Sequence, residues 1–385
     1  MSRYLFVVPP LVGHINPTLA VGRELARQGH DVAWAGDARV IHALGGTDLM
    51  VCDCATMSLE ERGDLVGPAA LKFLWEHFFI PLARAMALGV SAAIEQFAPD
   101  IVIADQQALA GSLIAEREGI TWITSATTST ELTDPLESLP KVKDWVIGLL
   151  DELRDEIGVP GTGNDPRFSP HGILVFTTAE LSGSPAIAAE RCWMVGPALA
   201  EDLTSAARGD FPWEFLDNDQ LNVLISMGTV NGATGAAFLR KAAAAIGARP
   251  DRYRAVLVDP DGVIEDPPSN ILVQEFVPQR ALLPAMDAVI CHAGHNTVCE
   301  SLWNGLPLVT APVRDDQPVV AQQVVDAGAG LRLRFRRATE QHIADALDTV
   351  LDPASGHQAA AARIGQSFRD AGGAARAAEI LAGLG

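Results

Sequence analysis

The stretch from Asn270 to Ala329 constrains the fold of this chain more than any other part. Two apolar, strand-like runs, Asp287–Ile290 and Leu306–Thr310, enclose the turn His292–Thr297 and a helical pattern that continues through Trp303. A strand, a turn of small residues and a helix start form an anion site, because free N–H groups and the positive end of the helix dipole point at the turn. The stretch therefore predicts an α/β sheet that binds an anion at its edge.

Polar side chains gather at this same edge. His292, Asn296 and Thr297 add hydrogen-bond donors at the turn, and Glu300 follows one helical turn later, where it could take a sugar hydroxyl. Asp316-Gln317 follow the next strand, and α/β sheets bind ligands at the carboxyl ends of their strands. Taken singly, Asn and Thr often only cap a helix, and a lone histidine is often structural. Their convergence favours a ligand site.

The spacing of these residues resembles the nucleotide-sugar signature of the UDP-glycosyltransferase superfamily, and especially of the actinobacterial enzymes that glycosylate macrolides, enediynes and other natural products. The matching positions are Phe276-Val277-Pro278-Gln279, His292-x-Gly294-x-Asn296-Thr297-x-x-Glu300, Pro307, Pro312 and Asp316-Gln317. The resemblance implies the GT-B fold, an α/β architecture of two facing Rossmann-like domains with parallel sheets.

The resemblance also implies roles for individual residues. Phe276 would stack on the uracil or thymine ring, where the family usually has tryptophan, and Gln279 and Glu300 would reach the ribose. Val277 and Gly294 belong to the same donor signature, and Asp316 and Gln317 would hold sugar hydroxyls. Position 295, which is Trp or Gly in many relatives, is His here.

The N-terminal segment predicts a second ligand edge. Tyr4–Pro9 is typical of a buried strand, and Asn16 and Pro17 suit the start of a helix that runs to about Gln28. With the next strand at Asp31–Ala35 this gives a βαβ unit and hence a parallel sheet. His14 is then expected on the first strand-to-helix loop, as a capping or packing residue or as a general base. The resemblance favours the base.

An acid follows another predicted strand of this half. Asp105 closes Ile101–Ala104, where an ordinary acid would cap the next helix. The resemblance instead pairs it with His14, so that Asp105 holds one ring N–H, fixes the tautomer and stabilises the imidazolium. The polar run Ala126–Thr130 could place hydroxyls near an acceptor or simply form a loop.

The predicted acceptor half also contains the densest aromatic run of the chain, Phe73–Phe79. It lies in a stretch, Asp48–Pro81, without clear periodicity, ahead of a helix predicted over Leu82–Phe97. Most of these rings are expected to pack in the core, and a minority could line an apolar acceptor pocket.

Domain boundaries follow from a mixed, aperiodic stretch near the middle of the chain. We expect an acceptor-binding domain over 1–205, a linker over 206–219, a nucleotide-sugar domain over 220–365 and a C-terminal helix over 366–385 that returns to the first domain, as in relatives. The second domain restarts with the strand Leu221–Ile225 and the turn Ser226-Met227-Gly228-Thr229. Ser226 and Thr229 resemble the family's second phosphate contact.

Composition excludes several other classes of protein. The net charge of −20 and pI of about 4.7 argue against nucleic acid and anionic membranes as partners. The five cysteines are scattered, which predicts no disulfide framework and a cytoplasmic protein. No signal peptide and no uninterrupted apolar run of membrane-spanning length are found. Asp217-x-Asp219 and Asp259-x-Asp261 are interpreted as chance rather than a metal site.

The sequence thus predicts an inverting, metal-independent glycosyltransferase without cofactor. It would move a hexose or deoxyhexose from a UDP- or dTDP-sugar to a hydroxyl of a lipophilic natural product, with His14 as general base. A homodimer is possible. The alternatives are a nucleotide-sugar epimerase or hydrolase on the same fold, and a nucleotide-sugar-binding protein with a degenerate active site.

Overall fold

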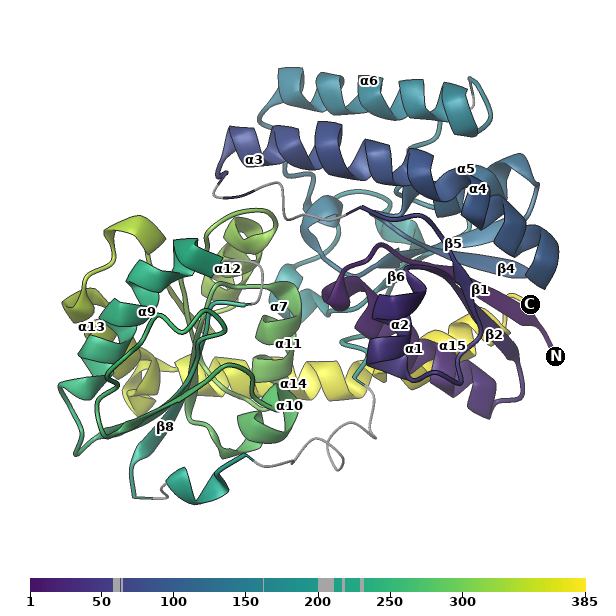
Figure 1. Cartoon of the computed structure of the whole chain (residues 1–385). Coiled ribbons are helices and arrows are strands. Elements are labelled where there is room, and N and C mark those ends of the chain that lie inside the picture. The colour runs from purple at the N-terminus through teal and green to yellow at the C-terminus, as the bar shows by residue number, and fades with distance from the viewer. Residues whose placement is uncertain (58–62, 64, 162, 200–210, 217–218, 229–231) are drawn as a thin grey trace. The chain divides into compact units, whose positions relative to one another are not determined.

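The chain divides into two compact units (Figure 1). The computed structural model describes residues 1–57, 63, 65–161, 163–199, 211–216, 219–228 and 232–385. The first unit comprises Met1–Ala179, Ser184–Ala200 and Ala371–Gly385, and the second comprises Glu180–Gly183 and Glu201–Asp370. Half of the predicted linker, 206–219, lies outside the described residues.

The first unit is built on a parallel sheet in which, among the described residues, seven strands follow the order β3-β2-β1-β4-β5-β6-β7. Helices cover both faces, so the central strands are apolar on both sides rather than alternating. The strands are β1 Arg3–Val7, β2 Asp31–Gly36, β3 Val51–Asp53, β4 Ile101–Asp105, β5 Thr121–Ala126, β6 Ile173–Val175 and β7 Cys192–Met194.

Two apolar cores lie on opposite faces of this sheet. Leu5 and Val7 of β1 pack with the helices of one face, whereas Tyr4 and Phe6 pack with those of the other. The first face carries α3 Pro68–Phe73, α4 Ile80–Phe97, α5 Leu109–Arg117 and α6 Pro140–Ile157, and the second carries α1 Val12–Arg27 and α15 Gly373–Ala382, with α2 Ala38–Gly45 beside α1.

The helix predicted over Leu82–Phe97 is longer than expected. Helical backbone begins at Pro68 and passes through a π-helical turn, Leu74–Phe79, into α4. This turn directly precedes Pro81, whose missing N–H removes one hydrogen bond of a regular helix. Pro68–Phe97 is long and apolar enough to cross a membrane by length and composition, but half of its apolar window is buried inside the first unit.

Two other predicted helix starts were wrong. α1 begins at Val12, with Leu11 as N-cap, so Pro17 lies inside the helix and His14 lies in its first turn rather than on the preceding loop. The acidic segment Leu149–Ile157, whose sequence predicts a helix of its own, is the second half of α6, which begins at Pro140. In both cases the helix starts in residues without an apolar period, where packing against the sheet decides the conformation.

The second unit contains a six-stranded parallel sheet within its described part, in the order β10-β9-β8-β11-β12-β13. Its strands are β8 Leu221–Ser226, β9 Tyr253–Val258, β10 Ile271–Gln274, β11 Ala288–Cys291, β12 Leu308–Thr310 and β13 Gly330–Arg332. Phe238 and Leu347 lie in the core on one face, and Leu302, Val324 and Phe368 in the core on the other.

Helices again cover both faces of this second sheet. One face carries α9 Gly232–Gly247 and α13 Glu340–Leu351, and the other carries α10 Gln279–Leu282, α11 His295–Trp303, α12 Gln317–Asp326 and α14 His357–Ala371; the short helix α7 Ala179–Ser182 adds Leu181 to this second core.

The C-terminal helix α15 belongs to the first unit, where it lies beside α1 (Figure 1). Ala377, Ala378 and Leu381 are fully buried in the same core as Tyr4 and Phe6. The Tyr4 hydroxyl donates to the Leu381 carbonyl at 3.2 Å. The last helix is therefore part of the folding unit that the first strand begins.

We expect the Leu381→Ala variant to lose about 2–4 kcal/mol of unfolding free energy, because it opens a cavity in a fully buried site. Urea unfolding followed by circular dichroism measures the change. Leu384→Ala is the matched control: Leu384 is 44% exposed, and its loss should stay within about 0.5 kcal/mol. Equal effects of the two substitutions would contradict the packing of α15.

Candidate functional site

Each of the two sheets has a topological switch point, where successive strands begin to be added on the other side of the first strand. In the first unit the chain builds β1-β2-β3 to one side and then β4 to β7 to the other, so the switch lies between β1 and β4. In the second unit it lies between β8 and β11. Connections leave such a point in opposite directions and open a crevice at the carboxyl ends of the two strands. The predicted site residues concentrate at these two points.

His14 and Asp105 meet at the switch point of the first unit. His14 follows β1 in the first turn of α1, and Asp105 ends β4, which pairs with β1. The His14 Nδ1 atom lies 2.9 Å from both carboxylate oxygens, and the two side chains are 14% and 0% exposed. A carboxylate only accepts hydrogen bonds, so Nδ1 carries the hydrogen and Nε2 the lone pair. This arrangement is suited to a general base.

Two further groups donate hydrogen bonds to the Asp105 carboxylate, and the contact made by Thr127 was not predicted. The Thr127 hydroxyl donates to Asp105 Oδ2 at 2.9 Å and lies 2.6 Å from His14 Nδ1. The backbone N–H of Gln107 donates to Asp105 Oδ1 at 2.9 Å. Thr127 directly follows β5, which pairs with β4, so its position could have been inferred from the strand order but not from spacing.

Buried polar atoms without a hydrogen-bond partner also concentrate at this edge. Gln106 is 3% exposed, and neither its amide nitrogen nor its amide oxygen has a partner. Ser125 Oγ at the end of β5 and Thr177 Oγ1 beyond β6 share this property. Each such atom costs about 1–3 kcal/mol of stability unless water or a ligand satisfies it. Gln106 is thus a second candidate that the sequence analysis missed.

The backbone indicates on which face the Gln106 side chain emerges. Its N–H still donates to the Ser125 carbonyl, so the ladder between β4 and β5 continues to this residue. Side chains alternate along a strand, and the preceding Asp105 points to α1. Gln106 therefore follows Val102 and Ala104 onto the face covered by α3 and α4, whose core includes Trp75 and the other buried rings.

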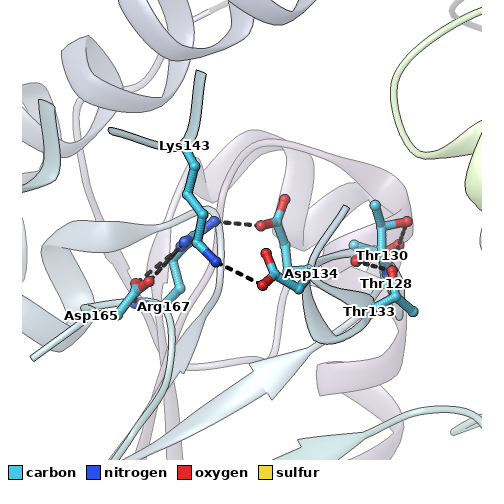
Figure 2. A network of polar contacts seen from close by, with 8 residues as sticks. Thr128, Thr130, Thr133, Asp134, Lys143, Asp165 and Arg167 are labelled. Carbon is cyan, nitrogen blue, oxygen red and sulfur yellow. Dashed lines mark hydrogen bonds and ion pairs between the residues drawn. The ribbon is translucent and has the colours of Figure 1, made fainter. Parts of the chain in front are cut away.

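The aromatic run lies mostly in the core, as expected. Trp75, Phe78 and Phe79 are buried, and Phe73 stacks on His77. Arg167 lies over the Trp75 ring at 5.5 Å and forms ion pairs with Glu131 and Asp165. Through these ion pairs Arg167 links the segment after β5 to the loop before β6, and Figure 2 shows its contact with Asp165.

His292 occupies the switch point of the second unit. It follows β11, and its ring lies between two glycines: a Cβ built on Gly228 would approach Cε1 within 2.7 Å, and one on Gly294 would approach Nε2 within 2.5 Å. Any larger residue at either position would displace the imidazole. Burial lowers the pKa of His292 to about 4, opposed by a hydrogen bond with the Ser226 backbone. The ring is therefore neutral at pH 7, and its Nδ1 atom has no partner.

The helix predicted after this turn begins at His295, with Gly294 as N-cap and no side-chain cap. Asn296 and Thr297 thus lie in the first helical turn, and capping does not explain them. Ser226 ends β8, where it is paired with Cys291 of β11, so it lies beside this helix start. Thr229 lies outside the described residues.

Gln279 and Glu300 form a contact of their own. The Gln279 amide donates to Glu300 Oε2 at 2.7 Å, and burial raises the pKa of Glu300. Phe276 is 78% exposed, whereas the Val277 side chain is 4% exposed and packs in the core. Phe276 can therefore present its ring to a ligand. Val277 can present only its main chain, because its side chain is buried.

Asp316 and Gln317 start α12, at the carboxyl end of β12. Gln317 Oε1 accepts the N–H groups of Val313 and Arg314 at 2.9 and 3.2 Å, which leaves its NH₂ group for a ligand. Ala293 and Asp315 adopt left-handed backbone, with φ of 67° and 59°, at the turns before α11 and α12. Such strain in non-glycine residues costs about 1–3 kcal/mol and gathers at functional sites.

All the predicted donor residues that are described lie in the second unit, and His14 and Asp105 lie in the first. Within the described ranges no cluster of three His, Cys, Asp or Glu side chains could hold a metal ion. Asp259, assigned to a turn by the sequence, accepts the Ile264 N–H in its own loop at 2.8 Å. Metal independence stays a prediction.

We expect Gln106→Met to stabilise the protein by about 1 kcal/mol, because it replaces a buried, unpartnered amide with an apolar side chain of similar length. Thermal and urea unfolding measure the change. Gln107→Met is the matched control, since Gln107 is partly exposed and should change little. A loss of stability specific to position 106 would mean that a tightly held water satisfies the amide.

The low pKa of His292 predicts a pH-dependent stability. Its folded pKa of about 4 lies below the ordinary value of 6.5, so the unfolded chain takes up a proton as the pH falls through this window. His292→Gln lacks this uptake. Urea unfolding measures the free energy of unfolding of both proteins. We expect the wild-type value minus the His292→Gln value to fall by about 2 kcal/mol between pH 6.5 and pH 5. His171→Gln, at an exposed position, is the control, and a pH-independent difference for His292→Gln would refute the burial of a neutral ring.

Comparison with known proteins agrees with this geometry. The family described as "UDP-glucoronosyl and UDP-glucosyl transferase" matches residues 213–363. The chain is 26% identical over 400 residues to 4'-demethylrebeccamycin synthase of Lentzea aerocolonigenes, covering 91% of this chain and 92% of that protein.

Solved structures show the same architecture over the full length. The glycosyltransferase of kitacinnamycin superimposes with a TM-score of 0.82 at 25% identity, over 99% of this chain and 98% of the other. The spinosyn rhamnosyltransferase complexed with thymidine diphosphate superimposes with a TM-score of 0.78 at 22% identity, over 99% and 100%. This chain is therefore a glycosyltransferase with the GT-B fold, and it resembles the UDP-glycosyltransferase superfamily, in particular the actinobacterial enzymes that glycosylate natural products.

Proposed function

We propose that the enzyme transfers a hexose or deoxyhexose from a UDP- or dTDP-sugar to a hydroxyl of a lipophilic natural product, with inversion at the anomeric carbon. The contact between His14 and Asp105 carries the proposal, because 2.9 Å separates Nδ1 from both carboxylate oxygens at a switch point. Relatives named as a synthase of demethylrebeccamycin and a mycarosyltransferase support the substrate class, and a neighbour bound to thymidine diphosphate supports the donor class.

The acceptor half of the reaction uses the first unit. His14 Nε2 takes the proton of the acceptor hydroxyl as its oxygen attacks the anomeric carbon, and Asp105 stabilises the imidazolium that forms. The unpartnered Gln106 amide is suited to a second polar group of the acceptor, because it offers both a donor and an acceptor. The enclosing residues on that face are apolar, which fits a lipophilic substrate.

The donor half uses the second unit. The first amides of α11, with Asn296, Thr297 and Ser226, receive the diphosphate, and His292 adds a neutral imidazole. These dipoles offset the charge on the leaving diphosphate without a metal ion. The exposed Phe276 stacks on the base, and the Gln279–Glu300 pair takes the ribose hydroxyls. Asp316 and the NH₂ group of Gln317 hold the sugar.

The test combines a donor screen with removal of the base. UDP-glucose and dTDP-glucose are offered with a panel of hydroxylated aromatic acceptors, and release of nucleoside diphosphate and glycoside is measured. We expect His14→Ala to lower kcat by about 10²–10⁴-fold with unchanged donor affinity, because only proton removal is lost. His171→Ala, an exposed histidine of the same unit, is the control and should keep wild-type turnover.

The outcomes separate the alternatives. Epimerised or free sugar from the donor alone, with no glycoside, would support an epimerase or hydrolase. Donor binding without any turnover would support a degenerate binding protein. Wild-type turnover in His14→Ala would refute the general base, and an α-glucoside formed from these α-linked donors would refute inversion.

A further inference from the structure

The Thr127 hydroxyl is the one side chain after β5 that contacts both members of the proposed dyad within the described part of the chain. Thr127 is 3% exposed. Its oxygen lies 2.6 Å from His14 Nδ1 and 2.9 Å from Asp105 Oδ2. Nothing in the donor or acceptor chemistry requires a hydroxyl in this position, so its contacts need an explanation of their own.

The positions of the hydrogens follow from the three groups. Asp105 only accepts, so the Thr127 hydroxyl gives its single hydrogen to Oδ2. The lone pairs of Thr127 then face the Nδ1–H group of His14, whose one hydrogen is shared between the hydroxyl and the carboxylate. Thr127 therefore donates to the acid and accepts from the histidine at the same time. A histidine with its hydrogen on Nε2 would instead turn a lone pair toward the carboxylate at 2.9 Å.

These contacts fix both partners. Asp105 receives hydrogen bonds from His14, Thr127 and the Gln107 N–H, so its carboxylate is held at both oxygens. On its Nδ1 side the imidazole faces two acceptors, the carboxylate and the hydroxyl. Rotation of the ring by half a turn is disfavoured because it would replace the Nδ1–H group by a carbon that cannot make these hydrogen bonds. A histidine that acts as general base must have its ring oriented and its tautomer fixed before the substrate binds.

We infer that Thr127 is a positioning residue that holds His14 in the tautomer with the lone pair on Nε2. This rests on the proposed role of His14 as general base. Among the described contacts of the threonines that follow β5, those of Thr127 are the ones that reach His14 and Asp105. Thr128 donates to Thr130 at 3.3 Å, and Thr133 donates to the Thr130 carbonyl at 2.8 Å, and both contacts lie within the local turn (Figure 2).

The experiment compares Thr127→Val, which keeps the shape and removes the hydroxyl, with Thr127→Ser, which keeps the hydroxyl. Thr133→Val is the matched control, because it removes a neighbouring hydroxyl that bonds only to backbone. Two quantities are measured: the kcat and donor KM of transfer from UDP-glucose or dTDP-glucose, and the tautomer of His14 in [¹⁵N]histidine-labelled enzyme. The His14 signals are those absent from the His14→Gln spectrum.

The expected result is a kcat lowered about 10–100-fold in Thr127→Val, a donor KM within about twofold, and part of the His14 population protonated at Nε2 instead of Nδ1. Thr127→Ser should return kcat to within about threefold and restore the Nδ1-protonated signal. Thr133→Val should match wild type in both measurements.

Two results would overturn the inference. One is a Thr127→Val enzyme whose His14 keeps the wild-type tautomer, and the other is a Thr127→Ser enzyme no better than Thr127→Val. The spectroscopic measurement needs no acceptor and no turnover. It therefore tests Thr127 even if the His14→Ala experiment refutes the proposed function, and the two failures are distinguishable.

Discussion

Parallel pairing of strands that are distant in sequence is the constraint on which both sites depend. The paired residues Tyr4 of β1 and Ile101 of β4 are almost a hundred residues apart in sequence, and Val223 of β8 and Ala288 of β11 are 65 apart. Because the strands run parallel, the residues that follow them meet at one edge. His14, Asp105 and Thr127 come together only through the pairing of β1, β4 and β5. A register shift by one residue would move each side chain to the opposite face of the sheet.

The sequence predicted the second site better than the first. The segment from β11 to α12 is contiguous, so its turn and its helix start could be read from spacing, and His292 and Gly294 lie where expected. The role of Gly228 could not be read in this way, because the ring that excludes a Cβ there comes from His292 on another strand. In the first site Asp105 was reached only through resemblance, while Thr127 and Gln106 depend on tertiary contacts.

The errors in the fold have different physical causes. α1 was expected to start near Asn16 because Asn and Pro commonly begin helices, yet the chain is already helical at Val12. The stretch before Leu82 showed no period because it is buried on more than one side and contains a π-helical turn, which breaks the 3.6-residue spacing. Short strands such as β3 and β13 are set by their neighbours rather than by local propensity.

The return of α15 to the first unit makes the second unit, apart from Glu180–Gly183, an insertion within the first. The chain enters the second unit near residue 200 and leaves it after Asp370, and the Tyr4–Leu381 hydrogen bond joins the two ends of the host. Exchange of the second unit between relatives therefore requires two junctions rather than a single crossover. A chimera spliced only near residue 200 would carry a foreign α15 against a native α1, and would report on that interface as much as on donor choice.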